Sequence, residues 1–183
     1  YTGKPDEEKV ELFNNVIYNY GSDGAYAGEG GSYNFINNYY KPGPFTATKP
    51  SYKRLFTAYA DDGKNNNVKG VHGVFFFKGN YIDPTCPKLS DKQRKDIKLV
   101  NKDNSLGLII KNDFAPAGEV LAMSPFVIAE HSSLQSASDA FVSVLKYAGA
   151  SLRRDSHDER IVREAKEGTY TFEGSHGSTN GMI

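Results

Sequence analysis

The sequence predicts a mainly β protein built as a solenoid, in which short parallel strands stack turn upon turn. Two observations carry this prediction. The 183 residues include 18 Gly, 12 Tyr and 11 Phe but no Trp, and such a composition favours strands and turns over long helices. In addition, three segments repeat the same order of a strand, a short polar break with Asn and a second strand. The length suits one domain with a sizeable core.

The repeats cover residues 10–18, 33–40 and 74–82. Asn15 and Asn38 lie 23 positions apart and Asn38 and Asn80 lie 42 apart, so the second interval fits one turn plus an insertion. Stacked Asn side chains at a corner would hydrogen-bond to each other and to the backbone. An antiparallel meander with Asn-rich loops is the alternative. The solenoid is favoured because the same pair of strands flanks the same Asn each time.

Residues 41–73 are predicted to form one long loop, because they are rich in Pro, Gly, Lys and Asn and show little alternation. Residues 41–78 hold seven basic and two acidic side chains, an excess of five positive charges. Such a surface suits a polyanionic polysaccharide, and tyrosines could stack on the sugar rings; these are Tyr39, Tyr40, Tyr52 and Tyr59. A solvated basic loop with tyrosines packed for stability is the alternative.

The last part of the chain changes character and predicts two helices. Residues 136–150 start with a possible serine N-cap, at Ser136 or Ser138, and end at a glycine. A second helix is expected to begin at a capping box over residues 156–159 and to end at Gly168. The chain is therefore divided into stacked turns over residues 1–135 and a helical extension over residues 136–183, which packs on the solenoid. Residues 88–103 are left without a predicted structure.

The composition also excludes several classes of function. Lys and Arg total 22, as do Asp and Glu, so no overall field indicates a nucleic-acid partner. No apolar run approaches the roughly 18 residues that span a bilayer. The single cysteine, Cys86, excludes an internal disulfide, and the four histidines show no metal-ligand spacing. No catalytic or metal-binding residue is therefore assigned. The candidates for substrate binding are Lys41, Arg54, Tyr40 and Glu29, the last lying among glycines that permit a sharp turn.

Two stretches of the chain are specific enough to suggest a family. Residues 14–21 read NNVIYNYG, and residues 25–44 read AYAGEGGSYNFINNYYKPGP. Together with the tail VLKYAGASL at residues 144–152, they resemble the pectate lyases of polysaccharide lyase family 1, in the form common in gut and environmental bacteria. The resemblance implies a right-handed parallel β-helix, secretion, and cleavage of polygalacturonate, the backbone of pectin, by calcium-assisted β-elimination with an arginine as the base.

The resemblance also implies that the residues that carry out the reaction lie outside this chain. The family's Arg-x-Pro-Arg stretch lies just before the segment that matches residues 14–19, and its calcium carboxylates lie further upstream. Residues 1–9 contain no such stretch, and Arg54 is the first arginine. The chain is therefore expected to be the C-terminal part of a pectate lyase, inactive alone, with the N-terminal half of the same protein as a partner. The alternative is a non-catalytic polysaccharide-binding or surface β-helix protein.

Overall fold

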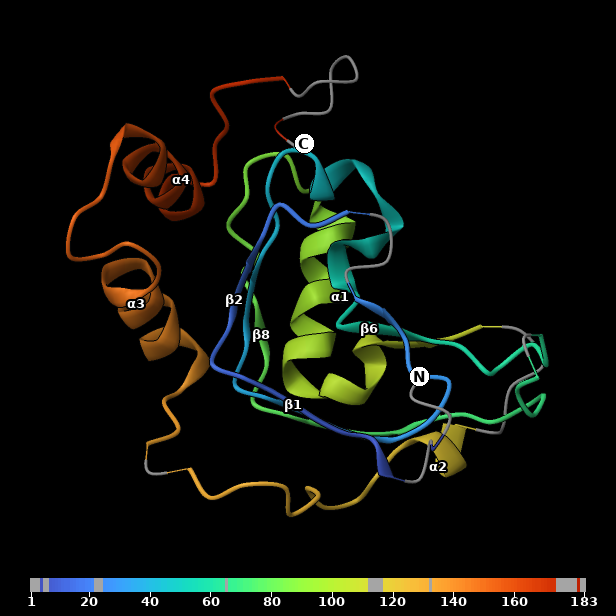
Figure 1. Ribbon diagram of the computed structural model, residues 1–183. Coiled ribbons are helices and arrows are strands. Elements are labelled where there is room, and N and C mark those ends of the chain that lie inside the picture. The colour runs from blue at the N-terminus through green and yellow to red at the C-terminus, as the bar shows by residue number, and fades with distance from the viewer. Residues whose placement is uncertain are drawn as a thin grey trace.

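The computed structural model describes residue 4, residues 7–21, 25–64, 66–111, 117–131 and 133–173, and residue 181. In these residues nine short strands form three parallel sheets, each with one strand from three successive turns of the chain (Figure 1). Sheet A is β1 (Lys9–Phe13), β4 (Ser32–Ile36) and β7 (Val74–Lys78). Sheet B is β2 (Val16–Tyr18), β5 (Tyr39–Lys41) and β8 (Tyr81–Ile82). Sheet C is β3 (Tyr26–Ala27), β6 (Phe56–Ala58) and β9 (Leu108–Ile110).

The strand register confirms the parallel pairing that the repeat predicts and shows that the antiparallel meander is wrong. Phe13 pairs with Ile36 and Val16 with Tyr39, so the Asn pairs between them fall in line. Asn15 donates to Asn38 Oδ1 at 2.9 Å, and Asn38 donates to Asn80 Oδ1 at 2.9 Å. Asn104 adds a further member that the repeat does not show, since its Oδ1 accepts from the Asn80 backbone at 2.8 Å. We call these four residues the Asn ladder.

Aromatic side chains fill the interior between sheets A and C. Strand alternation turns Phe35 and Phe75 inward, where both are fully buried. Tyr33 stacks on Phe75 with ring centroids 4.9 Å apart, and Phe35 stacks on Phe77 at 5.1 Å. Such offset ring pairs add to the stabilisation from buried area. The mainly β character predicted from the aromatic-rich repeats is therefore confirmed.

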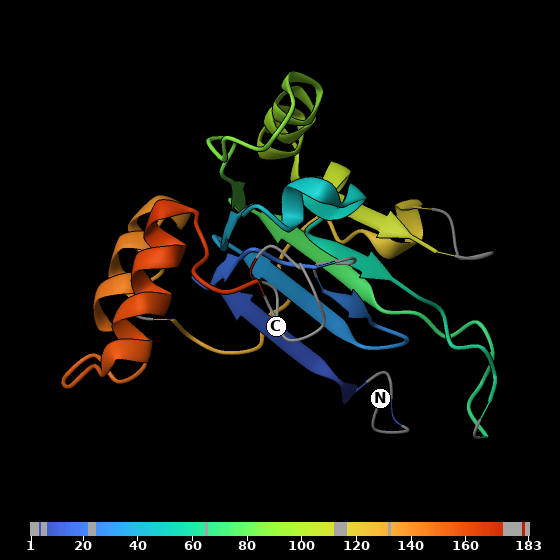
Figure 2. The ribbon, with the colours of Figure 1, turned by 90° about the horizontal axis from the view of Figure 1, so that it is seen from above.

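A helix, α1 (Asp91–Lys102), closes the end of the stack opposite β1 (Figure 2). It begins with a capping box between Ser90 and Gln93 and buries Ile97 and Val100. The side chain of Asn101 donates to the Ile82 carbonyl at 2.8 Å and accepts from the Ile82 amide at 2.7 Å. The Asn101 side chain thus satisfies the backbone amide and carbonyl of Ile82 at the edge of β8, as a further strand would. Sequence patterns left this segment unassigned.

The prediction of one long loop over residues 41–73 is wrong in its middle part. That range contains two 3₁₀ helices, η2 (Thr46–Thr48) and η3 (Pro50–Lys53), and strand β6. Leu55 and Ala58 are fully buried, so the segment enters the core. Its strand is only three residues long, too short to give a period-2 pattern. Residues 59–64 and 66–73 do belong to an extended connection, which projects beside the stack (Figure 1).

The remaining helices are η4 (Asn104–Gly107), α2 (Ala117–Val120), α3 (Ala137–Tyr147) and α4 (Ser156–Glu167). Ser136 caps α3, as predicted. The cap of α4 is Asp155, one residue before the predicted capping box, because its carboxylate accepts the amides of His157 and Asp158. No helix in the described part of the chain is long and apolar enough to cross a membrane.

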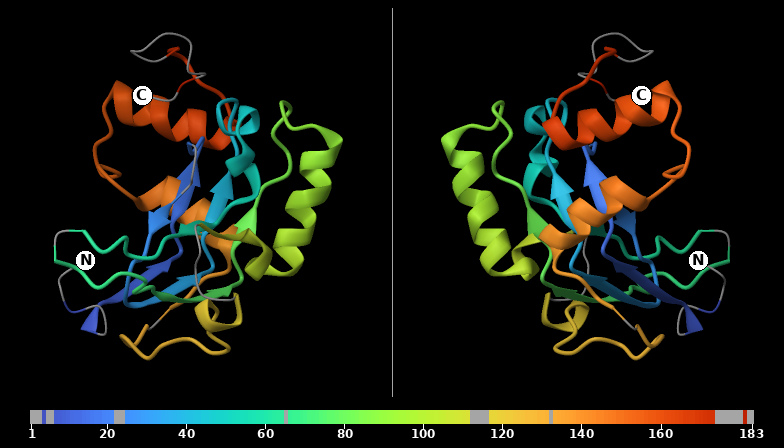
Figure 3. Two further views of the ribbon diagram at one scale, coloured as in Figure 1. Left: turned by 90° about the vertical axis from the view of Figure 1, so that its right-hand side faces the viewer. Right: turned by 90° about the vertical axis from the view of Figure 1, so that its left-hand side faces the viewer.

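The C-terminal third covers two of the three sheets from outside (Figures 1 and 3). Residues 121–131 cross sheet A, where the Asn34 side chain bonds the Phe126 backbone at 2.8 and 3.0 Å. His131 Nε2 lies 2.9 Å from Glu11 of β1. Helix α3 then packs on sheet B, and its Phe141 stacks on Tyr39 at 4.4 Å.

Candidate functional site

Sheet C differs from the other two sheets in what lies over its outer row. Residues 121–131 cover sheet A and α3 covers sheet B, whereas no described helix lies over the outer row of sheet C (Figure 1). That row is Tyr26, Thr57 and Ile109, which are direct partners in the parallel register. Thr57 is fully buried and Tyr26 is exposed, so the row is open at its Tyr26 end. Their strand neighbours point the other way, because Phe56 and Ala58 belong to the core.

An aromatic pair marks this outer face. The Tyr26 side chain is 67% exposed, an unusual position for a large aromatic residue on a strand. Its ring meets that of Tyr59 edge to face, with centroids 6.2 Å apart and an interplanar angle of 73°. Tyr59 follows β6 directly, and its amide donates to the Ala27 carbonyl at 2.9 Å. The pair therefore offers a fixed aromatic surface on which a sugar ring can stack.

The structure brings two of the four predicted binding residues, Arg54 and Glu29, to sheet C. Arg54 lies two positions before β6, and Glu29 lies two positions after β3. Because the strands are parallel, the two residues mark opposite ends of the sheet. Both side chains are half-buried. Glu29 acts electrostatically on Tyr33, whose pKa is raised chiefly by burial and then by the charge of Glu8.

The other two predicted residues, Tyr40 and Lys41, lie on sheet B. Tyr40 is 3% exposed and packs in the core, where its hydroxyl donates to the Leu55 carbonyl at 3.4 Å. Lys41 Nζ lies 3.3 Å from Asp83 Oδ2 and 5.1 Å from the Phe141 ring centroid. The structure does not place either side chain on an open face. Alternation turns Tyr40 inward, and the C-terminal helices cover Lys41.

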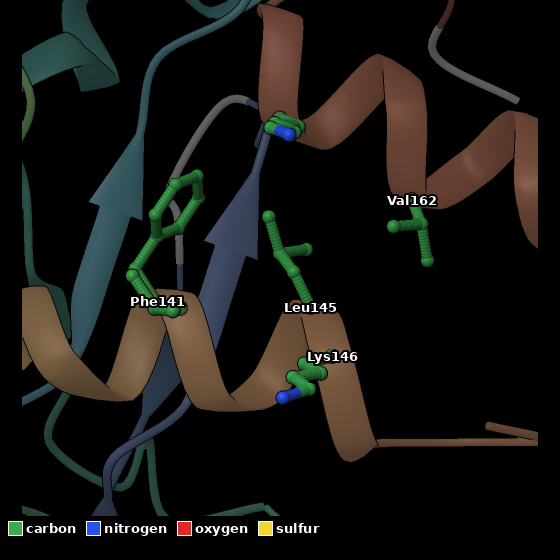
Figure 4. A pocket seen from close by; sticks show the side chains of 6 residues that line it. Phe141, Leu145, Lys146 and Val162 are labelled. Atoms are coloured by element: carbon green, nitrogen blue, oxygen red, sulfur yellow. The ribbon is translucent and has the colours of Figure 1, made fainter.

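Those helices enclose a hollow of about 290 Å³ (Figure 4). Figure 4 shows that Phe141 and Leu145 rise from α3 and that Val162 comes down from α4. The lining also includes Val142, Lys146 and Lys166. It has no hydroxyl, amide or carboxylate side chain, which a sugar site needs for specificity. We therefore assign this hollow to helix packing.

Part of the positive charge of residues 41–78 is paired with acids from outside that range. Asp83 pairs with Lys41, and Asp96 of α1 lies 3.7 Å from Lys53. Hydrogen bonds from Lys92 and Tyr52, followed by the charge of Lys53, lower the pKa of Asp96 to about 2. Lys41 and Lys53 are therefore already engaged within the protein.

Of the four tyrosines predicted to contact sugar, Tyr59 alone lies at sheet C. Tyr39 and Tyr52 are buried, and their hydroxyls donate to Asp83 and Asp96. Sequence reasoning missed Tyr26. The available signal is that this aromatic residue stands between Ala25 and Ala27, since an aromatic residue between two small residues fits a strand with one open face.

The described residues do not fit a calcium ion. They contain no group of three or more His, Cys, Asp or Glu side chains that could hold a metal, whereas calcium takes six to eight oxygen ligands. The Glu11 and His131 pair stands beside the Phe13 ring, whose centroid is 4.1 Å from that of His131. A histidine and one carboxylate are not a calcium ligand set.

The chain is similar in sequence to known proteins over most of its length. Probable pectate lyase C of Aspergillus fumigatus is 31% identical over 179 residues, which cover 94% of this chain and 33% of that protein. The proteins of the same name from Neosartorya fischeri and Aspergillus flavus are 32% and 30% identical, and each matches 85% of this chain and 31% of its own length. No family model matches the chain. These relatives are fungal, so the bacterial form of the resemblance stays a prediction.

The chain spans about a third of the length of the curated relatives that it matches. A match to a third of a longer protein is consistent with the expected C-terminal portion. This chain is homologous to about a third of the length of proteins named probable pectate lyase C.

Proposed function

We propose that the chain is the C-terminal part of a secreted pectate lyase that cleaves polygalacturonate by calcium-assisted β-elimination. The names of the homologues and the exposed aromatic pair on sheet C support the proposal. In this proposal, residues 1–135 form turns of a right-handed parallel β-helix and residues 136–183 form a helical extension. The three parallel sheets with strands from successive turns support that architecture. The arginine and the calcium ligands belong to upstream turns.

The Tyr26 edge of sheet C is the part of the polysaccharide site that this chain supplies. A galacturonate chain that lies along this edge would place sugar rings against Tyr26 and Tyr59. At one end, Arg54 would meet a carboxylate, since a guanidinium matches carboxylate geometry. At the other end, Glu29 would accept hydrogen bonds from sugar hydroxyls. The ring pair of Tyr26 and Tyr59 is the observation on which the proposal depends most.

The reaction is tested by the ultraviolet absorbance of the unsaturated product when polygalacturonate is mixed with the chain. The chain alone should give no product, with calcium or with chelator. Addition of the upstream polypeptide should give product that chelator abolishes. Calcium-dependent product from the chain alone would show that the catalytic groups lie within these residues.

Tyr26→Ala should weaken binding of polygalacturonate oligomers by about tenfold, because one exposed stacking surface is lost. Isothermal titration calorimetry measures the affinity. Phe172→Ala is the matched control, since Phe172 is 63% exposed against 67% for Tyr26 but lies beyond α4. An equal loss of affinity in both variants would remove sheet C from the site.

A non-catalytic polysaccharide-binding β-helix protein is the second candidate. The aromatic pair of Tyr26 and Tyr59 supports it equally, because stacking on a sugar ring needs no catalytic group. The two candidates differ in one outcome. If the chain and the upstream polypeptide together bind polygalacturonate but release no unsaturated product, the binding protein is the better description.

A further inference from the structure

A second groove lies between α3 and the corner that joins β1 to β2. Its volume is about 450 Å³. It is lined by Phe13, Asn14, Ser133, Gln135, Ala140, Ser143, Val144, Tyr147 and Ala148. The backbone of Gln135 is tied to the Asn14 side chain, with bonds of 2.8 and 2.9 Å. One wall of the groove is therefore held to the strand corner by two hydrogen bonds.

The polar groups of this groove are available to a ligand. The Asn14 side chain is used within the protein, since it also donates to the Asn37 carbonyl at 3.1 Å. In contrast, no described residue hydrogen-bonds the hydroxyls of Ser133, Ser143 or Tyr147, or the side-chain amide of Gln135. Four groups that can each donate and accept hydrogen bonds thus converge on one hollow.

The groove also has an aromatic surface. The Tyr147 side chain is 64% exposed. Lys146 Nζ lies 4.8 Å from the centroid of this ring and so occupies one of the two ring faces. The described lining carries neither an acid nor a base. Hydroxyls, an amide and an aromatic ring without charge suit a ligand that is neutral, rich in hydroxyls and flat on one side.

We propose that this groove binds a neutral oligosaccharide, independently of the polygalacturonate face on sheet C. An anionic galacturonate would find no cation among the lining residues to balance its carboxylate, because the nearest ammonium, that of Lys146, is held over one face of the Tyr147 ring and does not line the groove. The two sites lie on different sides of the molecule, because α3 packs on sheet B. Both can therefore be occupied at once, which would hold the protein on a mixed polysaccharide through two contacts.

The proposal is tested by titration of the chain with galactotriose, cellotriose and mannotriose, and with trigalacturonate for comparison. At least one neutral trisaccharide should bind, and Tyr147→Ala and Ser143→Ala should each weaken that binding about fivefold. Tyr26→Ala should leave it unchanged. Leu152→Ala is a control for exposed residues near α3, because Leu152 is fully exposed and does not line the groove.

Three results would overturn the proposal. One is the absence of binding by all three neutral sugars at about 10 mM. Another is unchanged affinity in both groove variants. The last is competition between trigalacturonate and the neutral sugar, which would place both on one site. None of these results bears on lyase activity, so the failure of this site is distinguishable from the failure of the proposed function.

Discussion

Asn80→Ala should lower the free energy of unfolding by about 3 kcal/mol. Asn80 is 3% exposed. Its Oδ1 accepts from the backbone and side-chain amides of Asn38, at 3.0 and 2.9 Å, and its Nδ2 donates to the Phe35 carbonyl at 2.7 Å. Alanine would remove the acceptor of the buried Asn38 backbone amide and the donor to the Phe35 carbonyl, whereas the Asn38 side chain would keep its bond to the Leu12 carbonyl at 2.9 Å. Urea denaturation followed by circular dichroism measures the loss.

Asn15→Ala is the matched control, since it removes the same side chain from the exposed end of the Asn ladder. The Asn15 side chain makes one bond, to Asn38 Oδ1 at 2.9 Å, and its backbone amide keeps its own bond to that atom. The expected loss is below about 1 kcal/mol. Equal losses at both positions would contradict the burial argument.

The Asn ladder also shows which parts of the fold can be predicted from the sequence and which cannot. Asn15, Asn38 and Asn80 repeat between recognisable strand pairs, so their stacking could be predicted. Asn104 could not be found in this way, because α1 replaces the strands that precede the Asn in the earlier repeats. The helix itself carries a signal, the capping box from Ser90 to Gln93, within a segment too polar to suggest a core contact.

The covered faces depend on contacts between residues far apart in the chain. Asn34 meets Phe126 across 92 positions, and Lys41 meets Asp83 across 42. Alternation within a strand indicates which side chains point outward, yet it does not show which outward face another segment covers. Lys41 was therefore predicted to bind substrate, and Tyr26 was overlooked.

Lys41→Met tests this correction and should lower the free energy of unfolding by about 3 kcal/mol. The side chains of Lys41 and Asp83 are 12% and 6% exposed, and methionine would leave the buried carboxylate without its cation. Affinity for polygalacturonate should stay unchanged in folded protein. Lys53→Met is the matched control, because the Lys53 side chain is 38% exposed and its pair with Asp96 spans 3.7 Å. That loss should be below about 1 kcal/mol.

The effect of Lys41→Met should also depend on pH. Burial by itself would raise the pKa of Asp83, but hydrogen bonds from Thr85, the charge of Lys41 and the Tyr39 hydroxyl hold it below its ordinary value. A carboxyl with a lowered pKa adds stability above its ordinary pKa of about 4, and this is lost as the pH falls through the lowered value. The difference between wild type and Lys41→Met should therefore be large near pH 7 and shrink as the pH falls below about 4 and through the lowered pKa of Asp83. A difference that stays constant over that range would mean that the ammonium group stabilises the fold through Phe141 and the Lys166 carbonyl instead.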